Sequence, residues 1–183
     1  GLCQREGRCD GAGTCRRYVL GTGCGATQCS GNVVTGRICD GQGNCGNDTS
    51  GVACAPYLCQ AGGCATSCQT GGDCLGAFYC DTTTLLCEPK RTNGGSCAAA
   101  VECVSGFCVD GVCCNTECGE QCEACDVSGS EGSCSAVSGA PHGTRPQCDA
   151  PDPACSGACD GAYRAACTYP GDQTLCGGSR CEG

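Results

Sequence analysis

Cysteine is the feature that most constrains this chain, because 29 of its 183 residues are cysteines. The large apolar residues Leu, Ile, Val and Phe together number only 20, too few for the core of an ordinary globular domain of this length. Such a composition is typical of a disordered chain unless covalent bonds replace the core. A cysteine content above roughly 8–10% indicates a disulfide-bonded scaffold. We therefore predict a small disulfide-rich fold.

The cysteine content also predicts the compartment. Disulfides persist in oxidising spaces, which indicates an extracellular or cell-surface protein. A metallothionein-like metal-binding protein is the competing interpretation, but it needs densely repeated ligand pairs, and only Cys122 and Cys125 form a C-x-x-C. The chain begins at Gly1 without a signal peptide, so we expect a mature or excised segment of a longer protein.

Charge and hydropathy exclude two classes of partner. The formal net charge of −9 argues against nucleic acid and anionic membranes, since both bind clustered Lys and Arg. No apolar run approaches the roughly 18–20 residues that a membrane span requires. We therefore expect no nucleic acid partner and no membrane span.

One cysteine pattern, which we call type A, occurs three times. Its first two copies read C-D-G-x-G-x-C and have cysteine gaps of 6, 9 and 5, whereas the third copy has gaps of 8, 9 and 5. Self-similarity of this kind indicates small repeated structural units. We interpret Asp10, Asp40 and Asp160, each followed by glycine, as turn-forming side chains. The copies comprise Cys9, Cys15, Cys24 and Cys29, then Cys39, Cys45, Cys54 and Cys59, then Cys159, Cys167, Cys176 and Cys181.

A second pattern, type B, occurs twice in the middle of the chain. Residues 107–113 (F-C-V-D-G-V-C) predict a tight β-hairpin, because Asp110 and Gly111 suit a type I′ turn. Residues 78–81 and 85–88 predict a looser hairpin around residues 82–84, and residues 89–95 read as a linker. The two copies comprise Cys68, Cys74, Cys80 and Cys87, then Cys97, Cys103, Cys108 and Cys113.

A third kind of unit follows Cys114. Cys118, Cys122 and Cys125 lie at i, i+4 and i+7, which predicts a short helix with all three on one face. Together with Cys114 they are assigned to disulfides of unknown pairing. Beyond this helix we expect loops that are pinned by further cysteines, namely Cys134, Cys148 and Cys155.

Acidic side chains recur along the predicted helix at every third position. We interpret them as a solvated face, with a weak calcium site as the alternative. These side chains are Glu117, Glu120, Glu123 and Asp126.

These patterns divide the chain into six units. Type A occupies residues 1–31, 32–60 and 159–183, type B occupies 61–90 and 91–114, and the helix-and-loop unit occupies 115–158. If a second copy followed head to tail, the interval from Cys181 to the next Cys9 would be 11 residues, close to the 10 between Cys29 and Cys39. We predict tandem short β-hairpin units with little helix in an elongated linear array, built either as a polyprotein or from stacked subunits.

The odd cysteine count points to an unpaired sulfur. A total of 29 allows at most 14 internal disulfides, and an odd cysteine in a secreted protein indicates an interchain bond or a free thiol. Cys3 lies outside the repeated units, so it is our candidate for the interchain or unpaired cysteine. A segment boundary that cuts a pair is the alternative.

Several segments together resemble a tandem cysteine-rich repeat of secreted and cell-surface proteins of myxobacterial type. They are residues 95–103 and 105–115, 122–126 (C-E-A-C-D), 139–145 (G-A-P-H-G-T-R) and 167–171 (C-T-Y-P-G). The resemblance covers most of the chain and implies large secreted or surface-anchored proteins with arrayed copies. The middle units resemble, more weakly, the Dickkopf-type cysteine-rich pattern, which implies a disulfide framework rather than an activity.

Residues that could carry chemistry are scarce. His142 is the only histidine and lies in a Pro-His-Gly turn context, so no His-rich zinc site can be assembled. A redox role for Cys122 and Cys125 would need a βαβ context that the sequence lacks. We therefore predict no catalytic residues, no cofactor and no metal ligands. Residues 47–49 (N-D-T) match an N-glycosylation sequon, which we interpret as accidental, whereas the hydroxyl-rich loops make O-linked glycans candidate partners.

The predicted function is that of a non-enzymatic extracellular structural protein, a surface stalk or a head-to-tail filament that associates with further copies of itself. The alternative is a secreted knottin-like binding module, a protease inhibitor or an adhesin. The basic pairs at residues 16–17 and 90–91 favour that alternative, because rigid loops lose little entropy on binding.

Overall fold

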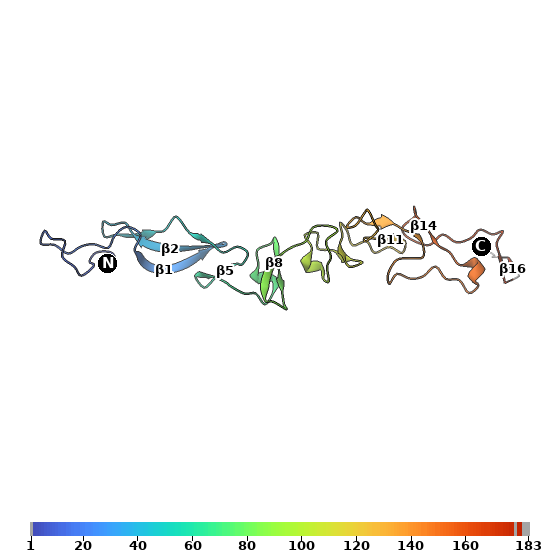
Figure 1. Ribbon diagram of the computed structural model, residues 1–183, viewed down its shortest axis with the longest axis horizontal. Coiled ribbons are helices and arrows are strands. Elements are labelled where there is room, and N and C mark those ends of the chain that lie inside the picture. The colour runs from blue at the N-terminus through green and yellow to red at the C-terminus, as the bar shows by residue number, and fades with distance from the viewer. Residues whose placement is uncertain (1, 178, 181–183) are drawn as a thin grey trace. The chain divides into compact units, whose positions relative to one another are not determined.

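The computed structural model describes residues 2–177 and 179–180 (Figure 1). The chain forms two compact units, Gly1–Pro89 and Lys90–Gly183, and the division falls at the start of the predicted linker. The described residues contain short antiparallel strand pairs, three single-turn 3-10 helices and no α-helix. Small disulfide-rich β-hairpin units are therefore confirmed. In this part of the chain no helix has the length and apolarity that crossing a membrane would require.

The first unit contains a four-stranded antiparallel sheet. Strands β1 (Gly23–Ser30), β2 (Val33–Cys39) and β3 (Cys45–Asn47) are adjacent in this order, and β4 (Val52–Ala53) also pairs with β2 (Figure 1). Gly31 adopts φ 61°, which allows the tight turn from β1 to β2. Because β1 comes from the first type A copy and β2 from the second, the two copies share one sheet.

A short hairpin follows this sheet. It consists of β5 (Cys59–Gln60) and β6 (Gly63–Cys64), and it places Cys59 opposite Cys64. Ala61 and Gly62 have φ angles of 48° and 81°, so both turn residues are left-handed, as in a type I′ turn.

The two type B hairpins form where the sequence predicts them. One consists of β7 (Phe78–Asp81) and β8 (Leu86–Pro89), preceded by the 3-10 turn η1 (Gly71–Asp73). The other consists of β9 (Cys108–Val109) and β10 (Val112–Cys113), preceded by η2 (Ala100–Glu102). Asp110 and Gly111 have φ angles of 53° and 80°, which confirms the predicted type I′ turn.

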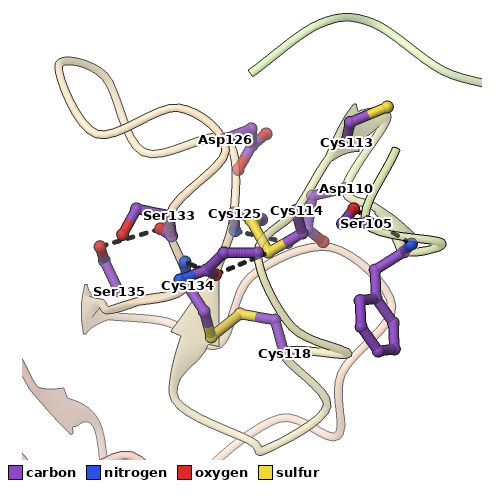
Figure 2. The surroundings of a disulfide bond; sticks show 12 residues. Ser105, Asp110, Cys113, Cys114, Cys118, Cys125, Asp126, Ser133, Cys134 and Ser135 are labelled. Atoms are coloured by element: carbon purple, nitrogen blue, oxygen red, sulfur yellow. Dashed lines mark hydrogen bonds between the residues drawn. A yellow bond between two sulfur atoms is a disulfide. The ribbon is translucent and has the colours of Figure 1, made fainter. Parts of the chain in front are cut away.

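The predicted helix through Cys118, Cys122 and Cys125 is wrong. Cys118 has φ 43°, which interrupts a right-handed helix, and each cysteine bonds a different segment: Cys134, Cys159 and Cys114 respectively. Instead, β11 (Glu123–Ala124) pairs with β12 (Ser135–Ala136). Figure 2 shows the Cys118–Cys134 disulfide beside Cys114 and Cys125. The helical spacing therefore reflects three separate disulfide partners rather than one helix face.

The remaining elements of the second unit are equally short. β13 (Ser138–Gly139) pairs with β14 (Cys159–Asp160), and β15 (Leu175–Cys176) pairs with β16 (Ser179–Arg180). Asp152 caps the 3-10 turn η3 (Pro153–Cys155), because its side chain accepts a hydrogen bond from the N–H of Ala154.

Sulfur replaces the aliphatic core. In the described part of the chain, the buried apolar side chains are all cysteines apart from Tyr79 and Ala124. Most of the buried cysteines gather in four separate clusters of three or four, each with at most two partly buried neighbours. Aliphatic side chains such as Val19, Leu20 and Leu175 lie exposed instead. The fold thus depends on many local disulfide clusters and not on one hydrophobic core.

Candidate functional site

The type B units carry their disulfides internally. In each unit the first cysteine bonds the third and the second bonds the fourth, across loops of similar length. The bonds are Cys68–Cys80 and Cys74–Cys87 in the first copy, and Cys97–Cys108 and Cys103–Cys113 in the second. The four cysteines of each type B pattern therefore bond only among themselves, while Cys64, at the start of the first type B unit, bonds Cys54 of the preceding type A copy.

The first two type A units are bonded to each other. Cys24 of the first copy bonds Cys45 of the second, and Cys29 bonds Cys59. Cys3, which precedes the first copy, bonds Cys39 at a Cα–Cα distance of 5.5 Å. Because these bonds run from copy to copy, stacking of type A units is itself a covalent connection.

The third type A copy is bonded in a related way. Cys159 bonds Cys122 and Cys167 bonds Cys148, both in the unit at 115–158. Cys155 bonds Cys176, so the predicted pinning of loops by Cys134, Cys148 and Cys155 is confirmed. The two sulfurs of the C-x-x-C pair, Cys122 and Cys125, lie in separate disulfides rather than in one redox-active pair.

The sequence predicted Cys3 as the cysteine without an internal partner, and the structure shows two other cysteines in this state. Cys3 is bonded and almost fully buried, so its prediction as the unpaired cysteine is wrong. Cys9 and Cys15 are exposed free thiols instead, against the prediction that both form disulfides. They lie opposite each other as an antiparallel bridge, in what we call the Cys9–Cys15 hairpin. Cys181 lies outside the described residues.

Copy-to-copy bonding is the physical reason why Cys3 is bonded whereas Cys9 and Cys15 are free. The partner of Cys39 is Cys3, and that of Cys45 is Cys24, so both lie upstream of the hairpin that they hold. Cys9 and Cys15 are the corresponding residues of the first copy, and only Cys3 precedes them in this sequence.

Sequence reasoning overlooked Cys64. This residue bonds Cys54 at a Cα–Cα distance of 5.0 Å and closes the hairpin that ends the second type A copy. It falls outside the repeated gap pattern, which is why the repeat comparison did not reveal it. The Gly62–Gly63 pair between Cys59 and Cys64 is a hairpin signal that could have found it.

The aspartates of the type A copies form the predicted turns. Asp10 accepts hydrogen bonds from the N–H groups of Ala12 (2.7 Å) and Thr14 (3.1 Å) and from the Thr14 hydroxyl. Asp40 repeats this arrangement with Gln42 and Asn44. These hydrogen bonds, the side-chain one first, hold the pKa of both carboxyls below the ordinary value. The turn geometry is therefore the same in both copies.

The third aspartate, Asp160, forms a similar turn. It accepts hydrogen bonds from the N–H groups of Ala162 (2.8 Å) and Tyr163 (2.7 Å). These bonds, that of Tyr163 first, likewise lower its pKa.

A polar hollow of about 520 Å³ lies beside Cys15. Side chains from both of the first two type A copies line it, among them Gln4, Arg17 and Asn44. The Arg17 guanidinium donates a hydrogen bond to the carbonyl oxygen of Gln42. The thiol of Cys15 therefore faces an open, polar surface that could receive another polypeptide segment.

The four acidic side chains of the predicted helix do not converge on one shared site. The buried Glu123 lies 3.4 Å from the Arg164 guanidinium and accepts a hydrogen bond from the Glu120 N–H. Asp126 lies 2.8 Å from Nε2 of His142. Glu117 and Glu120 are exposed. Because Glu123 and Asp126 contact different partners, the arrangement is structural in character and does not resemble a calcium loop.

A partly buried ion pair connects the second type B hairpin to the loop that follows residue 139. Asp110 accepts two hydrogen bonds from the guanidinium of Arg145 (2.8 and 3.1 Å) and one from the Cys125 N–H (2.9 Å). Burial raises the pKa of Asp110, but these hydrogen bonds outweigh burial and leave its pKa lowered. Arg145 also donates to the carbonyl oxygens of Cys118 and His142. His142 is thus a turn residue of a structural network.

The sequon asparagine, Asn47, is exposed at the end of β3. Glycosylation of the hydroxyl-rich loops stays a prediction.

The described residues thus form a covalent scaffold with one exposed pair of thiols, Cys9 and Cys15. Comparison of the chain with protein-family models, with curated proteins and with solved structures gives no match, so the functional argument rests on this geometry alone.

Proposed function

We propose that this chain is a non-enzymatic extracellular structural protein, whose disulfide-bonded repeats build a surface stalk or a head-to-tail filament. The observation that carries the proposal is the copy-to-copy bonding of type A units through Cys24–Cys45 and Cys29–Cys59. A repeat that bonds covalently to its neighbour can be extended by further repeats without a new kind of contact.

Disulfide density supports a mechanical role. A disulfide that closes a loop of about 15 residues stabilises the fold by about 3 kcal/mol, mainly by restricting the unfolded chain. The 13 disulfides of the described residues close loops with sequence separations from 10 to 37 residues. Since these bonds are distributed along the chain, local opening of one unit leaves the others closed.

Composition supports an oxidising extracellular location. A chain with this many disulfides needs an oxidising compartment, in which thiols do not stay reduced. Methionine and tryptophan, two oxidation-sensitive residues, are absent from the sequence. Both features suit a long-lived surface structure.

The basic pairs offer less support for the inhibitor alternative. The Arg91 guanidinium donates a hydrogen bond to the carbonyl oxygen of Ser96 (2.8 Å) and pairs with Glu102. Arg16 lies 3.9 Å from Glu6, and Arg17 contacts Gln42. These side chains are engaged by their own chain, whereas an inhibitor loop presents its arginine to the protease.

The test is electrophoresis and intact mass with and without reductant, after alkylation of free thiols under denaturing conditions. We expect a ladder of disulfide-linked species that collapses to one band on reduction. A chain that stays monomeric at every concentration and binds a partner saturably would overturn the proposal in favour of a binding module. Alkylation of most cysteines would overturn it in favour of a metal-binding protein.

A further inference from the structure

Two of the three hairpins that open the type A copies, those at Cys39–Cys45 and Cys159–Cys167, have matching disulfide partners. The first cysteine of the hairpin bonds a residue 36 positions upstream in Cys3–Cys39 and 37 positions upstream in Cys122–Cys159. The second cysteine bonds a residue 21 positions upstream in Cys24–Cys45 and 19 positions upstream in Cys148–Cys167. The same upstream separations, counted back from Cys9 and Cys15, reach no residue of this sequence.

A bond between Cys9 and Cys15 does not fit this pattern. Cys39 and Cys45 also lie directly opposite each other, as register partners of β2 and β3, yet each bonds a separate upstream segment. Cys159 and Cys167 flank the bridge between Ala158 and Thr168 and likewise bond separate segments. The hairpin geometry therefore directs its two sulfurs to two outside partners.

Matching partners exist in the third type A copy. Cys155 lies four residues before its copy's first cysteine, as Cys3 lies six residues before Cys9. Cys176 lies nine residues after Cys167, and Cys24 lies nine residues after Cys15. Cys155 and Cys176 thus correspond to Cys3 and Cys24, the two residues that receive the second hairpin.

The receiving sulfurs are close together in both copies. The sulfur atoms of Cys3, Cys24 and Cys39 all lie within 4.8 Å of one another, although Cys3 and Cys24 bond different hairpin residues. Cys155 and Cys176 are bonded to each other, with a Cα–Cα distance of 5.6 Å. If a hairpin entered between Cys155 and Cys176, each of these two sulfurs would bond a cysteine of the hairpin in place of the other, and the backbone would need no large movement.

We infer that the Cys9–Cys15 hairpin of one copy docks on the Cys155–Cys176 pair of a second copy, and forms Cys9–Cys155 and Cys15–Cys176 disulfides. This inference rests on the proposed head-to-tail function and names its junction.

Exposure of the two hairpin thiols and of Leu175, beside the buried Cys155, supports this occupant. Cys9 and Cys15 are exposed, whereas their counterparts Cys39 and Cys159 are buried beneath the segments that they bond. Leu175, next to Cys176, leaves 58% of its surface exposed. Exposed apolar groups of this kind gain free energy when a second copy covers them.

The chemistry balances as one exchange and one oxidation. The Cys9 thiolate attacks the sulfur of Cys155, the Cys155–Cys176 bond breaks, and Cys176 leaves as a thiolate. Cys176 and Cys15 are then oxidised to a disulfide by a low-molecular-weight disulfide, which accepts two electrons and two protons and becomes two thiols. Two protein thiols and one protein disulfide thus become two interchain disulfides.

The experiment uses two double variants of the full chain in a buffer of reduced and oxidised glutathione. The hairpin-blocked variant carries Cys9→Ser and Cys15→Ser, and the receptor-blocked variant carries Cys155→Ser and Cys176→Ser. We expect the unmodified chain to form a ladder, each variant alone to stay monomeric, and an equimolar mixture to give a covalent dimer and nothing larger. With one variant labelled with ¹⁵N, peptide mapping should find both predicted bonds joining a labelled and an unlabelled peptide.

Other outcomes overturn the inference. The hairpin-blocked variant removes no bond present in the structure, so a ladder from it counts against the inference even if the receptor-blocked variant misfolds. An intrachain Cys9–Cys15 bond, or a ladder linked through other cysteines, sinks the inference, and the second result leaves the proposed function standing. If only a two-copy tandem fusion forms both bonds, the occupant is an adjoining repeat of the same polypeptide rather than a second copy. If neither separate chains nor the fusion form them and no ladder appears, the inference and the proposed function both fail.

Discussion

The Cys9–Cys15 hairpin and its counterpart at residues 39–45 have the same local structure and a different covalent state. Both follow the C-D-G-x-G-x-C pattern, both turn on an aspartate that accepts two backbone hydrogen bonds, and both place their cysteines opposite each other. Cys39 is fully buried in a disulfide, whereas Cys9 and Cys15 are exposed thiols. Local sequence thus specifies the turn, and an upstream segment specifies the disulfides and the burial.

This difference shows which part of a type A copy is self-contained. The turn needs only its own residues, because its donors and acceptors lie within five positions of one another. The sulfur cluster beneath it needs the preceding copy. The first hairpin therefore has its turn but lacks the disulfides and the burial of the second.

Native alkylation should separate the two hairpins most strongly. Iodoacetamide without reductant should modify Cys9 and Cys15 in the folded monomer and leave Cys39 and Cys45 unmodified, because a disulfide sulfur is no nucleophile. Mass spectrometry of proteolytic peptides measures the modification at each site. Equal protection of all four cysteines would mean that the first hairpin already has partners.

Removal of disulfide sulfurs should affect stability in only one of the hairpins. The paired substitution Cys3→Ser with Cys39→Ser opens a loop of separation 36 and should lower the free energy of unfolding of the first unit by about 3–4 kcal/mol. The matched pair Cys9→Ser with Cys15→Ser should leave it unchanged. Guanidinium unfolding can be followed by tyrosine fluorescence, since Tyr18 packs against the Cys3 cluster. Equal losses in both variants would contradict the asymmetry.

The turns were predictable from sequence because their causes are local. Asp110 and Gly111 form a type I′ turn since both residues tolerate positive φ, and the aspartates of the type A copies cap their own loops. The hairpin signals likewise identified the type B units, whose cysteines pair in the same order in both copies.

Disulfide partners were not predictable in the same way, because they depend on which segments meet in space. Cys3 seemed superfluous from its position, yet it holds Cys39 of the next copy. Periodicity misled at Cys118, Cys122 and Cys125, where three bonds to distant segments happen to fall at helical spacing. A cysteine position reports a covalent partner as readily as a buried face, so helix periodicity carries little weight when cysteines supply it.

Acid should open the first hairpin before the second. Hydrogen bonds lower the pKa of both Asp10 and Asp40, so each contributes stability that is present above its unfolded-state pKa and is lost as the pH falls through its folded-state pKa. The disulfides of Cys39 and Cys45 still hold the second turn when Asp40 is protonated. Amide hydrogen exchange at low pH should therefore be faster at Thr14 than at Asn44, and carboxyl NMR titration should find both aspartates below the ordinary range. Equal exchange at the two amides would contradict this expectation.

Glycine substitution should give the smallest difference. Gly11 and Gly41 have φ angles of 86° and 75°, a region that costs an L-residue about 1–2 kcal/mol. An added methyl group meets no close contact at Gly11, and at Gly41 its nearest neighbour is the Leu20 backbone nitrogen at 3.5 Å. Gly41→Ala should therefore lower the global free energy of unfolding by about 1 kcal/mol, because its hairpin is covalently joined to the sheet. Gly11→Ala should leave global unfolding unchanged and accelerate only the amide exchange of Thr14. If Gly11→Ala destabilised the unit as much as Gly41→Ala, the first hairpin would be as firmly integrated as the second, and the docking of a further copy would have nothing left to complete.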